Sequence, residues 1–131
     1  MKRFGFLFSV LFLVLLSACT SDDRNKIVGG ELTVYFIDKQ DESLAKEVAL
    51  YWKEHDLVTG KPQDLELSKA ENGYVLAMIA KKPNELDLMT FTEKRLLNEL
   101  KMDLYETIFE EKPFNLVLSN PKFETLYVIG Q

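Results

Sequence analysis

Cysteine and histidine, on which most metal and nucleophile sites depend, occur once each in this chain of 131 residues, as Cys19 and His55. A single cysteine excludes an intramolecular disulfide, and no Cys/His ligand spacing follows it. The Gly29-Gly30 pair precedes an expected strand, whereas a dinucleotide-binding fingerprint would follow one. No nucleophile with a neighbouring base stands out. The sequence therefore predicts a protein that is not an enzyme and holds no metal ion or cofactor.

Cation sites built only from oxygen ligands have weak candidates. Asp38, Asp41 and Glu42 come closest, but the glycine and the distal glutamate of a calcium-binding loop are missing. We therefore expect these three acids to form a solvated turn. Glu110 and Glu111 are adjacent in sequence and would point apart on a helix, which predicts a solvated face.

The first 18 residues have the pattern of an export signal. Lys2 and Arg3 precede an apolar run over residues 4–16, and small residues follow the run. Because about 20 residues of helix are needed to cross the hydrocarbon core, this run is too short for a permanent membrane span. We expect residues 1–18 to be a cleaved signal peptide.

The run ends in Leu16-Ser17-Ala18-Cys19, which resembles the lipobox of bacterial lipoproteins, Leu-[Ala/Ser]-[Gly/Ala]-Cys, at every position. The resemblance implies cleavage between Ala18 and Cys19, a diacylglycerol thioether on the Cys19 sulfur and, usually, an acyl chain such as palmitate on its new amino group. One acyl chain holds a protein only marginally, whereas two or three hold it stably. The mature protein would therefore be anchored to a membrane through Cys19.

Residues 19–30 would connect this lipid anchor to the folded domain. The segment is polar, acidic at first, and ends in a glycine pair, which is typical of a flexible tether. Thr20 is not the Asp that resembles an inner-membrane retention signal in some bacteria, so the outer membrane of the cell envelope is favoured. Asp22-Asp23 is similar to the acidic tag with which some lipoproteins reach the cell surface. The periplasmic and surface faces both stay open.

The chain is acidic, with a formal net charge of −5. Loss of the first 18 residues, which carry two cations and no acid, would leave 113 residues with a net charge of −7. One domain of this length can bury a proper core. The negative charge argues against nucleic acid as a partner and favours solubility or a cationic partner.

Residues 31–131 are expected to form that single domain. Alternating apolar residues predict strands, and apolar residues spaced by three or four predict helices. Asn72-Gly73 favours a hairpin turn, and Thr90 with Glu93 has the spacing of a capping box. The predicted elements are a strand over 31–37, a helix over 41–56, strands over 63–69 and 74–80, a helix from Thr90 to Pro113, and strands over 114–118 and 123–129.

Each predicted helix has one apolar face. In the first helix this face holds Leu44, Val48, Tyr51 or Trp52, and His55. Tyr51 and Trp52 fit the core or its edge, and His55 fits a C-terminal cap; together the three are also the best candidates for a ligand or partner surface. In the second helix the buried stripe is Leu97, Leu100, Leu104 and Ile108, with Leu96 alongside and with Glu99 and Asp103 facing water.

The resulting order, β-α-β-β-α-β-β, is the ferredoxin-like split β-α-β pattern with one strand added at the C-terminus. It predicts an α+β fold in which two helices cover one face of a mainly antiparallel sheet.

Strong anchoring together with missing catalytic chemistry favours a non-enzymatic envelope lipoprotein that binds another protein or a peptide at the membrane surface. One alternative is a small-ligand carrier, or an enzyme without recognisable motifs, with a cleft near the first helix. A second alternative is an inhibitor or immunity lipoprotein that neutralises a basic toxin or enzyme through the acidic surface.

Overall fold

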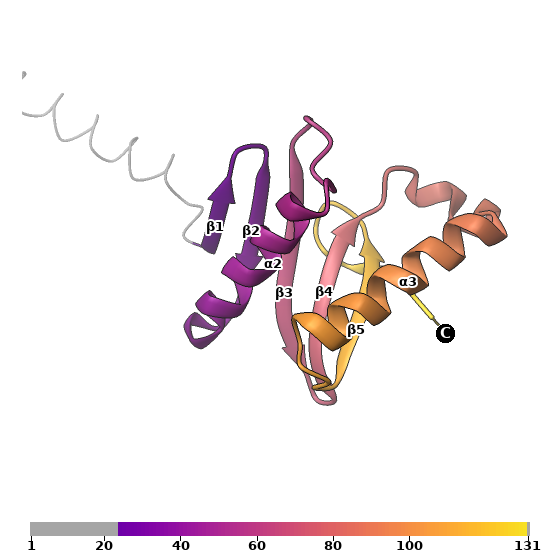
Figure 1. Cartoon of the computed structure of the whole chain (residues 1–131). Helices are drawn as coiled ribbons and strands as arrows, with labels where there is room; N and C mark the ends of the chain where they lie inside the picture. The colour runs from indigo at the N-terminus through magenta and orange to yellow at the C-terminus, as the bar shows by residue number, and fades with distance from the viewer. Residues whose placement is uncertain (1–23, 131) are drawn as a thin grey trace, which may run out of the picture.

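The computed structural model describes residues 24–130, in which two α-helices lie on one face of a six-stranded mixed sheet (Figure 1). The strands are β1 (Asn25–Gly29), β2 (Leu32–Phe36), β3 (Gln63–Ala70), β4 (Gly73–Ile79), β5 (Phe114–Ser119) and β6 (Thr125–Val128). The helices are α2 (Glu42–Glu54) and α3 (Phe91–Thr107), preceded by the 3-10 helices η1 (Lys39–Asp41) and η2 (Pro83–Leu88). The predicted α+β class is confirmed.

The strand order in the sheet follows the order along the chain, from β1 at one edge to β6 at the other. From β2 onward the predicted sequence of elements is the observed one. The ferredoxin-like arrangement is not confirmed, because there the two strands joined by a helix have another strand between them. In this sheet β2 and β3 are direct parallel neighbours, and so are β4 and β5.

The two β-α-β crossovers, β2-α2-β3 and β4-α3-β5, differ in hand. The pair β2–β3 runs antiparallel to the pair β4–β5, and both pairs step the same way across the sheet. Two crossovers of the same hand would then place α2 and α3 on opposite faces. Since both helices cover one face (Figure 1), one crossover is right-handed and the other is left-handed, which is rare in parallel β-α-β units.

β1 corrects the expectation of a flexible tether over 19–30 for one part of that segment, residues 25–29, which form a strand. Asn25–Gly29 pairs with β2 in an antiparallel ladder, and Gly30, with φ of +62°, allows the tight turn between the two strands. Ile27 and Val28 supply the β-branched side chains that suit a strand. The predicted signal peptide and its cleavage site, between Ala18 and Cys19, lie outside the described residues. No helix within residues 24–130 is long and apolar enough to span a bilayer.

The core lies between the sheet and the helices. Alternate residues of the strands face it, and they meet the apolar stripe of α2 and a narrower stripe of α3. Its fully buried members include Leu32, Val34, Val48, Leu67, Leu76, Leu104, Phe109, Leu116 and Ile129. Tyr127 of β6 and Ile129, just after this strand, pack in the core, whereas Leu126 is exposed. The ladder between β5 and β6 has an irregularity at Leu118/Ser119.

Within residues 24–130, the opposite face of the sheet is covered by the β5–β6 connection, which passes behind the sheet in Figure 1. Phe123 in this connection meets the Tyr35 ring of β2 edge-on, at 6.0 Å between centroids. Asn120 holds the loop, since its side-chain oxygen accepts hydrogen bonds from the backbone of Lys122 and Glu124. These bonds support the left-handed backbone of Phe123, whose φ is +63°.

The hairpin between β3 and β4 is present, with Gly73 pairing Ala70 instead of occupying the turn. A Cβ atom on Gly73 would lie 2.2 Å from the carbonyl oxygen of Pro113, and its φ is +125°. Any side chain at position 73 would collide with the backbone of Pro113, just before β5, so only glycine fits here.

α3 begins as predicted, because the Thr90 hydroxyl accepts the Glu93 N–H at 3.1 Å. Its buried stripe is shorter than predicted. Leu104 is fully buried, while Leu97, Leu100 and Ile108 are only partly buried and Leu96 is 55% exposed. The first half of the helix extends beyond the sheet (Figure 1), so few of its residues reach the core.

Replacing Leu104 with alanine should therefore cost about 2 to 5 kcal/mol of unfolding free energy, through lost burial and a cavity. The matched control is Leu96→Ala on the same helix, which should change stability by less than about 0.5 kcal/mol because that side chain is largely in water. Urea denaturation of both variants measures the difference. Equal midpoints for the two would contradict this packing of α3.

Candidate binding groove between the helices

The two helices are joined where they come closest over the sheet. The hydroxyl of Tyr51, near the end of α2, donates a hydrogen bond to the carboxylate of Asp103 in α3. Tyr51 is only 6% exposed. Burial first, then this hydrogen bond and the negative charge of Asp103, raise the pKa of the Tyr51 phenol above its ordinary value. The sequence predicts that Asp103 faces water. Its side chain is 46% exposed, but the carboxylate also accepts the Tyr51 hydrogen bond, a helix contact that the sequence does not predict.

His55 completes this contact from the end of α2. It is the C-cap residue of the helix, as predicted, and its Nδ1 lies 3.0 Å from the Tyr51 carbonyl oxygen. Its ring stacks on the Tyr51 ring with centroids 3.9 Å apart, and its Nε2 lies 4.0 Å from the Asp103 carboxylate. The imidazole therefore supports the junction between the helices.

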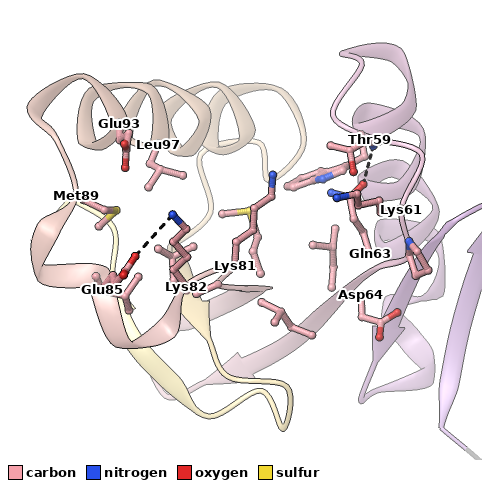
Figure 2. Close-up of a pocket in the computed structure, with 18 of the residues that line it drawn as sticks. Thr59, Lys61, Gln63, Asp64, Lys81, Lys82, Glu85, Met89, Glu93 and Leu97 are labelled. Atoms are coloured by element: carbon pink, nitrogen blue, oxygen red, sulfur yellow. Dashed lines mark hydrogen bonds and ion pairs between the residues drawn. The ribbon is translucent and has the colours of Figure 1, made fainter.

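Beyond this junction the helices separate and leave a groove of about 940 Å³ above β3 and β4. Figure 2 shows α3 and the η2 segment along one side and the connection from α2 to β3 along the other. The apolar part of the lining is Trp52, Pro62, Leu65, Met78, Ile79, Ala80, Leu86, Leu88, Met89, Leu97 and Leu118. Trp52 is 2% exposed, so its indole belongs to the core as well as to the groove wall.

The charged lining residues stand near the rim. They are Lys61, Asp64, Lys81, Lys82, Glu85 and Glu93. Lys82 forms an ion pair with Glu85 at 3.8 Å, drawn as a dashed line in Figure 2. At the other side the Thr59 N–H donates to the Gln63 side chain at 3.1 Å, which fixes the loop that enters β3. An apolar floor with a few polar groups around it is the usual form of a ligand site.

A second polar cluster lies at the far end of the sheet from the groove. Asp41 is buried, accepts a hydrogen bond from the Tyr74 hydroxyl at 3.2 Å and pairs with Lys69 at 3.6 Å. The Asp41 carboxylate raises the pKa of Lys69. Asp38 caps η1 by accepting the Gln40 N–H at 3.0 Å. The prediction of a solvated turn is therefore wrong for Asp41, which ties η1 to β3 and β4.

The structure does not bring Tyr51, Trp52 and His55, the residues predicted for a ligand or partner surface, together at one site. Only Trp52 lines the groove, while Tyr51 and His55 hold the helices together beside it. The groove wall made by η2 is not among the predicted elements, although the apolar residues Leu86, Leu88 and Met89 recur within this segment of the sequence. Within residues 24–130 no group of three or more His, Cys, Asp or Glu side chains is placed to hold a metal ion.

Comparisons with known proteins assign no family to the chain: no family model, no curated protein and no solved structure matches it.

The buried Tyr51 phenol predicts a loss of stability at alkaline pH. Below its ordinary pKa of 10.0, tyrosine is protonated in both the folded and the unfolded chain, so the stabilising contact is complete. As the pH rises above that value the unfolded chain ionises first, and stability falls by up to about 1.4 kcal/mol per pH unit. Tyr51→Phe should make this fall shallower, as measured by denaturation between pH 8 and 11.5. An unchanged slope in Tyr51→Phe would show that another group is responsible.

Proposed function

We propose that this chain is a lipid-anchored envelope protein, not an enzyme, whose domain binds a peptide or a protein segment in the groove between α2 and α3. The observation that carries the binding part is the groove itself, which combines an apolar floor with an interrupted polar rim. Its volume of about 940 Å³ stands near the upper end of the usual range of roughly 300 to 1,000 Å³ for ligand sites. A space of this size can hold several consecutive side chains of a peptide.

The anchoring part rests on the lipobox resemblance and gains a geometric consequence from β1. Only residues 20–24 separate Cys19 from the sheet, and five residues reach at most about 20 Å. The domain would stay within roughly its own diameter of the membrane surface. A protein held so close meets partners on the same surface at a high effective concentration, so a weak interface suffices.

A small-ligand carrier is the second candidate, favoured by the place of Trp52 in the groove wall. An apolar metabolite that filled the floor would raise the melting temperature by mass action. A groove that binds peptides should bind extended peptides directly, whereas the groove of a small-ligand carrier should not.

The anchor is tested by Cys19→Ser. Residue 19 precedes the described domain, so this variant should fold as the wild type does and yet stay unattached to the membrane. Incorporation of labelled palmitate and flotation of membranes provide the measurements. Label in the variant, or a wild type that fractionates with soluble proteins, would contradict lipidation at this residue.

The groove is tested with neighbouring leucines of α3, since Leu97 lines it and Leu96 does not. Peptides selected from a random displayed library on the Cys19→Ser protein are titrated against Leu97→Lys and Leu96→Lys. We expect binding to weaken about tenfold or more for Leu97→Lys, which corresponds to about 1.4 kcal/mol, and to stay within twofold for Leu96→Lys. Equal weakening would place the peptide site elsewhere.

A further inference from the structure

The charged residues that line the groove differ in whether they have an ion-pair partner. Lys82 is paired with Glu85 at 3.8 Å. Asp64 adjoins Leu65 in β3, and because successive side chains alternate across a sheet, its carboxylate lies on the opposite face, pointing away from α3 in Figure 2. Glu93 stands at the η2 end, on the first turn of α3. Within residues 24–130, Lys61 and Lys81 line the groove without an ion-pair partner.

Lys81 has the more informative position of these two lysines. It follows β4 by two residues, next to the apolar floor formed by Met78 and Ala80. Figure 2 shows its side chain rising from the sheet into the space between the helices, whereas Lys82 turns toward Glu85. An ammonium group over an apolar floor can bind an anionic group whose apolar neighbours fill the space below.

From this placement we propose that the groove recognises a negatively charged apolar peptide, with a carboxylate held by Lys81 and the adjoining side chains packed on the apolar floor. The inference rests on the proposed function, because it names the chemistry of the same peptide site. The net negative charge of the chain repels such a peptide at long range. Recognition therefore depends on the short-range attraction between the Lys81 ammonium group and the peptide carboxylate.

The test compares two probes, the peptide N-acetyl-Leu-Phe-Leu with a free carboxylate and the same peptide as its C-terminal amide. Trp52 is the only tryptophan of the chain and lines the groove, so its emission reports binding of either probe. At low salt we expect the acid to bind about five- to tenfold more tightly than the amide. This preference should fall to within about twofold of equality in Lys81→Gln.

Lys53→Gln is the matched control, because it removes the same charge from an exposed position on α2 that does not line the groove. The control should keep the preference for the acid. Equal binding of both probes to the wild type, or an undiminished preference in Lys81→Gln, would overturn the assignment to Lys81 while leaving peptide binding intact. If neither probe changes Trp52 emission or competes with the library peptides, this inference is overturned but the proposed peptide site in the groove is not. If the library peptides themselves do not bind in the groove, both proposals are overturned.

Discussion

Burial of one sheet face beneath both helices is the constraint on which the rest of this structure depends. With the strands in chain order, that burial requires crossovers of opposite hand. Among the described residues it also leaves the other face without a helix, and the β5–β6 connection, which contains Phe123, covers part of that face. The strained backbone of Phe123 is consistent with this task, because the ring must turn back onto the sheet to reach Tyr35.

The same constraint sets the place of the groove. α2 and α3 approach closely enough at Tyr51 and Asp103 for a hydrogen bond, whereas η2 starts α3 beyond the edge of the core. Phe91, at the first position of α3, is consequently 81% exposed. Side chains that would fill the space above Leu65 and Met78 in a fully packed domain are missing there, and the space stays open to solvent.

Local patterns in the sequence predicted most elements of this fold but not their arrangement. The period of apolar residues located both helices, and the Thr90 cap and the hairpin before Gly73 were recognisable from short-range chemistry. The neighbour order of strands depends on contacts between residues far apart, and the usual right-handed crossover favours a split sheet when both helices share a face. Asp103 shows the same limit, because its partner Tyr51 is 52 residues away and no helical period reveals it. For the site, only Trp52 was anticipated.

The groove is also where local and global preferences conflict in this domain. Leu88, which lines the groove, and Phe91, at the start of α3, would gain stability by burial, yet both side chains remain largely in water. Sequences that specify one structure usually satisfy such preferences, and departures from that consistency tend to gather where a protein acts. On this argument the sparse packing of the first half of α3 is consistent with the proposed peptide site, because a more tightly packed helix would close the groove.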